Sequence, residues 1–363
     1  MKIEQIDKNF ATQNVEIVGD KAVYAIPNES FDLYGVFYDQ KEKRFRRMPS
    51  EIAQKVSDGV AWLVKNSTGG RLRFSTDSDY FGIDVAYDEF TPMGHMPLSG
   101  SCGFVLLEEE DGWVKRVGSF RPEVRGNEEG YSRSIALNGG VMRSYILYFP
   151  LYNHVTDLKI TLSANAKVEH GKKYKGVAPI LYYGSSITQG GCASRPDNAY
   201  QALISKWNNI DFINLGFSGS AKAEDAMVDY LASLDCSLFV CDYDHNSPST
   251  EYLQATHYRL YERYRAIKKD TPILFASKPD FNGGNNIDRR EVIFQTYKKA
   301  REAGDNNVYF IDGETFFGKG DWDRENCTVD GCHPNDLGFF RMAKGFYKKM
   351  KEIDLVFKGE DND

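Results

Sequence analysis

The pattern of hydrophobic residues changes near residue 170, and this change limits the folds open to the chain. From about Lys21 to Leu162, short apolar or alternating runs are separated by turn signals such as Gly69-Gly70 and Asn138-Gly139-Gly140. Short runs of this kind, separated by residues that favour hairpin turns, are typical of antiparallel strands. We therefore expect an antiparallel, jelly-roll-like β-sandwich here, with one helical insert over about Glu51 to Val64.

After residue 170, short apolar runs alternate with amphipathic helical patterns. Strand–helix repeats of this kind build a parallel sheet with helices on both faces. The expected strands are 180–183, 212–215, 237–243, 273–276 and 308–311, and the clearest helices are 251–269, 288–303 and 336–353. We predict a flavodoxin-like three-layer α/β/α sandwich with a five-stranded parallel sheet, in which ligands bind at the carboxyl ends of the strands.

Length and charge narrow the organisation and the partners. A chain of 363 residues suits two domains, and the polar linker 169–176 predicts a division into residues 1–172 and 173–363. The net charge of −7 comes without a basic cluster, which argues against nucleic acid and anionic membranes as partners. The start of the chain lacks the apolar core of a signal peptide, and no stretch approaches the roughly 20 apolar residues of a membrane span. We expect a cytoplasmic protein.

The six cysteines show no C-x-x-C spacing that would suit zinc. In a reducing compartment they should be free thiols. Cys192 and Cys332 lie close in sequence to candidate site residues, but a thiol nucleophile is the weaker interpretation because the chain places a serine at the strand end.

That serine is Ser186, in the run 184–188 (Gly-Ser-Ser-Ile-Thr) directly after the first parallel strand. A polar turn is the plainer interpretation of this run alone. Near the other end of the chain, however, Asp330 and His333 are separated by two residues, so the carboxylate can hold one ring nitrogen while the other faces the serine. A serine, a histidine and an acid in this relation are what acyl transfer through a serine requires.

Two further polar positions follow the next two strands. Gly219 could present a backbone N–H, and Asn246 a side-chain amide, to an oxyanion at the same edge of the sheet. A strand-to-helix turn at Gly219, and an Asx turn or helix cap at Asn246, would explain the same residue types. His245 is a rival base that we rank second, because no acid stands at a matching spacing.

Taken in order, these segments resemble the sequence blocks of the SGNH (GDSL-type) hydrolases. The run 183–196 is similar to the subgroup with an N-terminal β-sandwich named for a Gly-x-Asp-Leu-Tyr motif, and the segments 71–78 and 149–153 add to this resemblance. The resemblance implies Ser186 as nucleophile, His333 as base and later acid, and Asp330 as its orienting partner. It also implies an oxyanion hole made by the Ser186 and Gly219 N–H groups and the Asn246 side chain.

The chain departs from the family pattern at three places. Ser185 stands where the family name expects aspartate, and Asp244-His245 stands where a glycine pair precedes the asparagine, which could narrow the pocket or misplace the amide. The Gly-x-Asp-Leu-Tyr motif corresponds to residues 103–107, which lack its Asp and its Tyr. A separate Asp32-Leu33-Tyr34 segment occurs earlier in the chain.

We predict a serine esterase that removes short acyl groups, acetyl above all, from a carbohydrate, and that needs no cofactor or metal. Arg195 and Lys278 are candidate substrate-binding residues at the rim of the sheet. A thioesterase, a lysophospholipase-like esterase or an acyltransferase would use the same triad. A carbohydrate-binding protein with impaired catalysis is the alternative outside enzymes. The N-terminal domain could shape the cleft, bind substrate or build a homo-oligomer.

Overall fold

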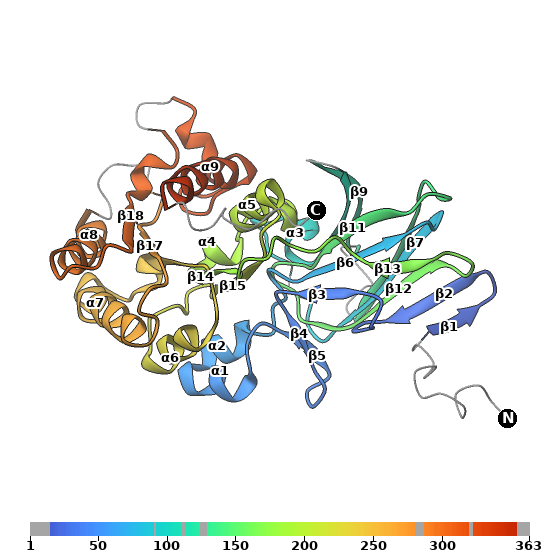
Figure 1. Cartoon of the computed structure of the whole chain (residues 1–363), viewed down its shortest axis with the longest axis horizontal. Helices are drawn as coiled ribbons and strands as arrows, with labels where there is room; N and C mark the ends of the chain where they lie inside the picture. The colour runs from blue at the N-terminus through green and yellow to red at the C-terminus, as the bar shows by residue number, and fades with distance from the viewer. Residues whose placement is uncertain are drawn as a thin grey trace.

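The computed structural model describes residues 15–90, 92–110, 113–123, 129–279, 287–318 and 322–353. Residues 1–14, on which part of the expectation of a cytoplasmic location rests, lie outside these ranges. Figure 1 shows two parts side by side, with the strands of the first half at one end of the molecule and the helices and strands of the second half at the other.

The first part is an antiparallel β-sandwich, as the sequence predicts. One sheet has the order β1-β2-β12-β7-β10, and the other has the order β13-β6-β11-β8-β9 with β3 paired to β6. The strands of these two sheets are β1 (Val15–Val18), β2 (Lys21–Ala25), β3 (Asp32–Tyr34), β6 (Arg71–Thr76), β7 (Tyr80–Tyr87), β8 (Phe104–Glu110), β9 (Trp113–Phe120), β10 (Gly130–Ala136), β11 (Arg143–Tyr148), β12 (Val155–Ser163) and β13 (Val168–His170). A short hairpin, β4 (Phe37–Asp39) with β5 (Arg44–Arg46), and helix α3 (Leu98–Ser101) complete this part.

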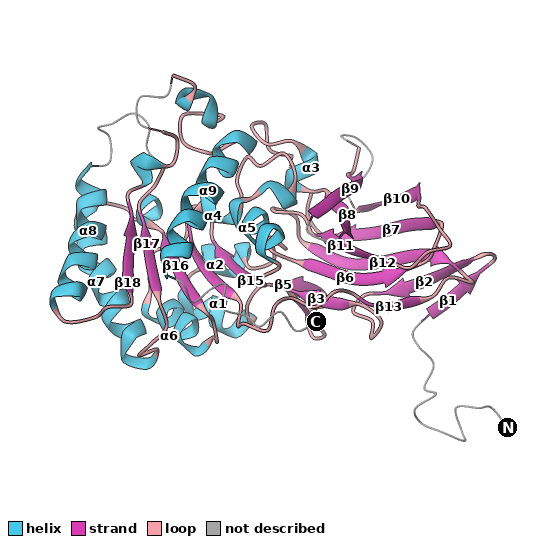
Figure 2. Ribbon diagram, turned by 45° about the horizontal axis from the view of Figure 1, so that its top comes forward, coloured by secondary structure: helices cyan, strands magenta, loops and turns pink. Residues whose placement is uncertain are grey.

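The core of the sandwich forms because alternate residues of its strands point inward. Phe74 of β6, Phe81 of β7 and Leu147 of β11 are completely buried in one apolar cluster with Ile160 of β12. Phe74 stacks on Phe81, with ring centroids 5.9 Å apart. Figure 2 shows the strands of the sandwich running roughly alongside one another.

The helical insert exists, but it is two helices. Helix α1 (Ser50–Val56) and helix α2 (Asp58–Leu63) are separated by Ser57, whose backbone is extended and whose side chain accepts a hydrogen bond from the N–H of Val60. The hydrophobic pattern runs through both helices, so it did not reveal the cap that separates them. Ala53 and Val60 are buried in the same apolar cluster as the parallel sheet of the second part.

The second part contains the five-stranded sheet in the order β15-β14-β16-β17-β18, and every paired neighbour is parallel. This is the 2-1-3-4-5 order of flavodoxin-like folds, so the predicted class is confirmed. The strands are β14 (Ile180–Gly184), β15 (Phe212–Gly216), β16 (Leu238–Asp242), β17 (Ile273–Ala276) and β18 (Val308–Ile311). All five residues of β14 and of β16 are buried, which is why these strands read as unbroken apolar runs.

Helices cover both faces of this sheet. The α-helices of the second part are α4 (Ser186–Gln189), α5 (Tyr200–Asn208), α6 (Asp225–Ser233), α7 (Thr250–Ile267), α8 (Ile287–Glu302) and α9 (Asp336–Ile353), with 3-10 turns η3 (Pro196–Asn198), η4 (Asp244–Asn246), η5 (Gly313–Thr315) and η6 (Arg324–Cys327). Helices α5 and α9 pack on one face, and α6, α7 and α8 pack on the other together with α1 and α2 (Figure 1). The first half of the chain therefore contributes to a helical layer of the second.

The segment between β13 and β14, where the sequence predicts a domain boundary, is anchored by Asp32. The Asp32 carboxylate accepts a hydrogen bond from the N–H of Gly171 (3.0 Å) and lies 2.9 Å from Nδ1 of His170. Asp32-Leu33-Tyr34 is strand β3, paired with β6, whereas Gly103 directly precedes β8. The earlier Asp-Leu-Tyr segment thus has a defined place at the junction of the two parts.

No helix in the described ranges has both the length and the apolar character needed to cross a membrane. All six cysteines lie in those ranges, and none of them forms a disulfide.

Candidate active site

Ser186 directly follows the carboxyl-terminal end of β14, at a sharp change from strand to helix. Ser185 makes this change possible: its backbone is extended, and its side chain accepts a hydrogen bond from the N–H of Ile187 (3.2 Å), so helix α4 begins at once. Gly184 is required just before, because a Cβ there would overlap the side chains of Asp242 and Thr188. Ser186 is only 6% exposed.

Ser186, His333 and Asp330 form a continuous hydrogen-bonded relay. The Oγ of Ser186 lies 2.9 Å from Nε2 of His333, and Nδ1 of the same ring lies 2.7 Å from Oδ2 of Asp330. If Nδ1 carries the ring proton and donates it to Asp330, Nε2 is free to accept the serine proton. The structure therefore brings together three side chains that the sequence placed in one site.

The turn that carries the acid and the base is held by the acid itself. Asp330 Oδ1 accepts hydrogen bonds from the N–H groups of Cys332 (3.0 Å) and His333 (2.7 Å). Partial burial alone would raise the pKa of Asp330, but the N–H and the ring of His333 and the N–H of Cys332 outweigh it and lower the pKa to about 2. Asp330 is therefore ionised at neutral pH and can hold the imidazole in one orientation.

Gly219 and Asn246 lie on two loops that are joined by a hydrogen bond. The Nδ2 of Asn246 donates to the carbonyl of Phe217 (2.7 Å), two residues before Gly219. Gly219 has φ +69°, a left-handed conformation that favours glycine. An amide nitrogen has two hydrogens, so Asn246 keeps a second donor beyond this bond. The predicted oxyanion roles of both residues stay predictions.

The loop of Gly219 is also tied to the helix that carries the nucleophile. The N–H of Phe217 donates to the carbonyl of Gly184 (2.8 Å), and the N–H of Ser218 donates to Oε1 of Gln189 (2.9 Å). Gln189 is the last residue of α4, which begins at Ser186. These bonds fix the turn relative to the serine, as preorganised donors to an oxyanion require.

Asp244, which departs from the family pattern, is held by two backbone N–H groups. Its carboxylate accepts hydrogen bonds from the N–H groups of His245 (2.9 Å) and Lys278 (3.1 Å), and burial raises its pKa to about 6. The His245 ring, ranked second as a base, has its Nε2 3.1 Å from Sγ of Cys332, so it contacts the turn of the relay.

The two predicted substrate-binding residues have different surroundings. Arg195 forms an ion pair with Asp197 (3.0 Å) and donates to Oδ1 of Asn198 (3.0 Å), which commits much of its guanidinium to local structure. Lys278 follows β17 and its backbone N–H binds Asp244. Contact of either side chain with substrate stays a prediction.

Cys192 is buried, and its thiol has a raised pKa. Burial, with the nearby charge of Asp330 and with Cys332, raises this pKa to about 12. The thiol is therefore protonated at neutral pH, which disfavours it as a nucleophile.

Residues from the first half of the chain also reach the relay, and sequence reasoning assigned them no role. The phenol of Tyr152 donates to the main-chain carbonyl of Ser186 (3.3 Å). The exposed ring of His95 lies 5.9 Å, centroid to centroid, from the ring of His333. Tyr152 belongs to the segment 149–153, which contributes to the family resemblance. The resemblance marked this segment, but it did not indicate that Tyr152 contacts Ser186.

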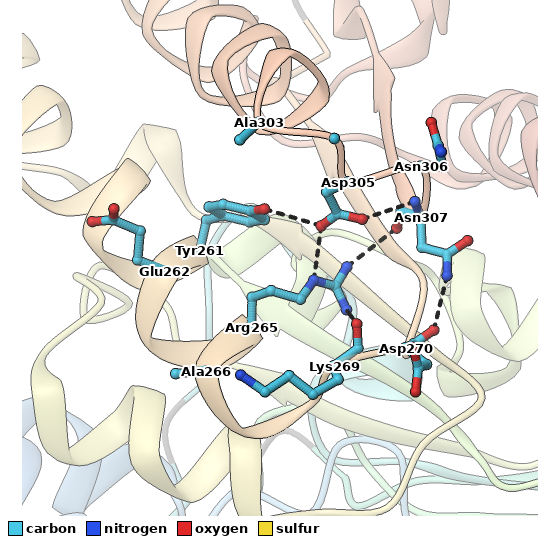
Figure 3. A pocket seen from close by; sticks show the side chains of 11 residues that line it. Tyr261, Glu262, Arg265, Ala266, Lys269, Asp270, Ala303, Asp305, Asn306 and Asn307 are labelled. Atoms are coloured by element: carbon cyan, nitrogen blue, oxygen red, sulfur yellow. Dashed lines mark hydrogen bonds and ion pairs between the residues drawn. The ribbon is translucent and has the colours of Figure 1, made fainter.

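A hollow of about 560 Å³ lies at the opposite edge of the parallel sheet, where β17 and β18 begin (Figure 3). Arg265 there donates to Oδ2 of Asp305 and to the carbonyls of Lys268 and Thr271, at 2.7 to 2.8 Å. The phenol of Tyr261 donates to the same carboxylate (3.0 Å). Since these polar groups bind one another, we interpret the hollow as a structural junction.

Two family models match the chain. The model of the GDSL-like lipase/acylhydrolase family matches residues 177–351, and the GxDLY model, the N-terminus of Esterase_SGNH_hydro-type proteins, matches residues 23–168. Together they span both parts of the molecule. Among curated proteins, no significant match was found.

Solved structures resemble the whole chain. A protein from Bacteroides ovatus described as a GDSL-like lipase is 28% identical, with a TM-score of 0.81, over 91% of this chain and 98% of that one. The salicylyl-acyltransferase SsfX3 from a tetracycline biosynthetic pathway is 17% identical, with a TM-score of 0.77, over 94% and 99% of the two chains. The acetyl xylan esterase Est2A from the rumen bacterium Butyrivibrio proteoclasticus is 12% identical, with a TM-score of 0.56, over 94% and 98%.

Proposed function

The chain belongs to the GDSL-like lipase/acylhydrolase family of ester-hydrolysing enzymes, and on this premise we propose that it removes short acyl groups, acetyl above all, from a carbohydrate through an acyl-serine intermediate. The observation that carries the proposal is the relay from Ser186 through His333 to Asp330, with links of 2.9 and 2.7 Å.

In the proposed first step, the Oγ of Ser186 attacks the ester carbonyl carbon and its proton passes to Nε2 of His333. The tetrahedral intermediate carries a negative oxygen, which the N–H groups of Ser186 and Gly219 and the amide of Asn246 would stabilise. Collapse breaks the bond to the alcohol, which leaves with the proton from His333.

In the second step, water gives a proton to His333 and adds to the acyl-serine. Collapse of that intermediate releases the carboxylic acid and returns the proton to the serine oxygen. Asp330 stays ionised throughout and stabilises the imidazolium that forms in both steps. This scheme uses only side-chain and backbone groups of the chain.

A catalytic role fits the site better than a binding role alone. A binding protein has no need for a nucleophile, a base and an acid in hydrogen-bonded sequence. The departure at Asp244-His245 does not oppose catalysis, because the Asp244 carboxylate is turned toward backbone N–H groups and Asn246 is bonded to the loop that carries Gly219. A carbohydrate scaffold is supported by the structural similarity to Est2A, an acetyl xylan esterase.

The test is hydrolysis of p-nitrophenyl acetate by the wild type and by Ser186→Ala, both checked for folding by thermal unfolding. We expect turnover by the wild type only, and undiminished turnover by the variant would remove the serine from the mechanism. Ser233→Ala is a matched control, because Ser233 is exposed at the end of helix α6 and takes no part in the relay.

A series of p-nitrophenyl esters tests the acyl length, since fastest cleavage of long chains would contradict the proposal. Acyl-CoA substrates and alcohol acceptors separate hydrolysis of sugar esters from thioesterase and acyltransferase activity. A fluorophosphonate probe that leaves Ser186 unlabelled, together with measurable glycan binding, would favour a binding protein.

A further inference from the structure

A pocket of about 260 Å³ lies next to the turn that carries Gly219, and nearly all of its walls come from the first half of the chain. The lining residues are Trp62, Leu63, Asn66, Glu89, Met93, Tyr152, His154 and Ser218. Only Ser218 in this set belongs to the second half of the chain. A pocket between two parts of a protein, lined by aromatic residues and a few polar groups, is a common place for a ligand.

The pocket is connected to the relay at two points. The phenol of Tyr152 donates to the carbonyl of Ser186, and Ser218 directly precedes Gly219, the predicted oxyanion donor. Met93 comes from the same loop as His95, whose ring lies close to that of His333. A molecule in this pocket would therefore lie within reach of the reacting serine.

The most prominent wall is the indole of Trp62 on helix α2. It stays 48% exposed, although its edge contacts the ring of His154 at 4.8 Å between centroids and the ammonium of Lys65 lies 4.6 Å from the ring. Large aromatic side chains left open in a cleft mark binding surfaces, because they offer a broad apolar face at low cost in conformational entropy.

The polar groups of the pocket suit an uncharged ligand with several hydroxyls. His154 is 4% exposed, and burial, with the charges of Lys65, Arg44 and Arg46, lowers its pKa to about 4 against the opposing effect of Asp88, so it is neutral at pH 7. Among the described lining residues, Glu89 alone then carries a formal charge, and that charge is negative. A carboxylate beside an aromatic wall accepts hydrogen bonds from hydroxyls and repels phosphate.

We propose that this pocket is the alcohol subsite of the enzyme, in which Trp62 stacks on a sugar ring of the ester while the acyl group occupies the oxyanion side. This inference rests on the proposed function and makes the β-sandwich part a determinant of specificity. The indole would contact the C–H face of the ring, and Glu89 would accept from its hydroxyls.

The experiment compares Trp62→Ala, Trp62→Phe and Trp113→Ala with the full-length wild type. Trp113, on β9, is a matched control because it is 53% exposed and does not line this pocket. Each protein is assayed on methyl acetate, whose alcohol is too small to stack on Trp62, on p-nitrophenyl acetate, and on acetylated xylotriose, acetylated mannotriose and acetylated N-acetylglucosamine. The best of these sugars for the wild type serves for the comparison.

We expect Trp62→Ala to lower kcat/KM for the acetylated sugar by about tenfold or more, mainly through KM, and to change kcat/KM for methyl acetate less than twofold. Trp62→Phe should retain part of the preference, and Trp113→Ala should match the wild type. The deacetylated sugar should inhibit p-nitrophenyl acetate cleavage competitively in the wild type and about tenfold less strongly in Trp62→Ala.

Three results would overturn the subsite while leaving the esterase proposal intact. They are equal losses on methyl acetate and on the acetylated sugar in Trp62→Ala, an unchanged sugar preference in that variant, or a wild type that cleaves p-nitrophenyl acetate but none of the acetylated sugars. A loss of sugar preference in Trp113→Ala instead would move the subsite to the pocket that Trp113 lines with Trp207 of helix α5. Failure of the wild type to cleave any ester would contradict the proposed function itself.

Discussion

Arg47, from the first half of the chain, donates a hydrogen bond of 2.6 Å to the main-chain carbonyl of Gly216 at the end of β15. The same buried guanidinium donates to the carbonyls of Leu63 (2.6 Å) and Asn66 (2.9 Å) and lies 4.6 Å from the ring of Phe217. It thus joins helix α2 to the strand from which the loop of Gly219 departs.

We predict that Arg47→Met lowers the free energy of unfolding by about 3 kcal/mol or more, because it leaves several buried carbonyls without a donor. Urea unfolding measures the change. Arg133→Met, which removes a surface ion pair with Glu123, should change the free energy of unfolding by about 0.5 kcal/mol or less. Equal effects of the two variants would contradict the structural role of Arg47.

Asp330→Asn should lower kcat by about 10³- to 10⁴-fold while the protein stays folded. An amide at this position would present a donor to Nδ1 and favour the tautomer whose Nε2 carries the proton, which cannot accept from Ser186. Steady-state kinetics on p-nitrophenyl acetate measure the loss. Asp235→Asn is the control, since that carboxylate is 94% exposed and remote from the relay, and activity should be unchanged. A fall of less than tenfold in Asp330→Asn would show that the acid does not set the tautomer.

Asn246→Ala should lower kcat by about 10²- to 10³-fold, equivalent to about 2.7–4 kcal/mol, with little change in KM, because an oxyanion forms only after attack. The side chain also binds the carbonyl of Phe217, so thermal unfolding must accompany the kinetics. Asn246→Asp removes the same donors at the same side-chain size and also places a negative charge near the oxyanion, so it should lower kcat at least as much. If kcat survives both substitutions, the amide is a structural cap and not an oxyanion donor.

Asp242 predicts a pH dependence of stability. Burial, opposed by hydrogen bonds from Thr188 and Tyr200 and assisted by the charge of Asp244, raises the pKa of Asp242 to about 8. The folded protein therefore holds a proton that the unfolded chain releases near pH 4. The contribution of this bound proton to the free energy of unfolding is fully present below about pH 4. It declines as the pH rises to about 8.

The effect is measured by urea unfolding of the wild type and of Asp242→Asn at pH 6, 7 and 8. The variant cannot ionise, so its stability relative to the wild type should rise with pH across this window. The pKa of Asp244 is raised only to about 6, so its contribution has largely ended there. Parallel curves for the two proteins would show that Asp242 is ionised well below pH 6.

Sequence reasoning located the parallel strands because each is buried on both faces and reads as an apolar run between polar turns. It also located the relay, since the loops after parallel strands meet at one edge of a sheet. It took α1 and α2 for a single helix because the apolar period continues through Ser57. The parts that it missed, Arg47, Tyr152 and Trp62, depend on contacts between segments far apart in the chain, and local patterns do not encode such contacts.

The packing of α1 and α2 has a consequence for how the two halves of the chain depend on each other. These helices share an apolar cluster with Leu181 and Leu215 of the parallel sheet, and a Cβ on Gly59 of α2 would meet the side chain of Ser220, the neighbour of Gly219. A fragment beginning at residue 173 would keep every residue of the relay but would expose apolar strand surface to water. We therefore expect the second half of the chain to be less stable alone than in the full chain, and truncations meant to isolate its activity should retain residues 47–66.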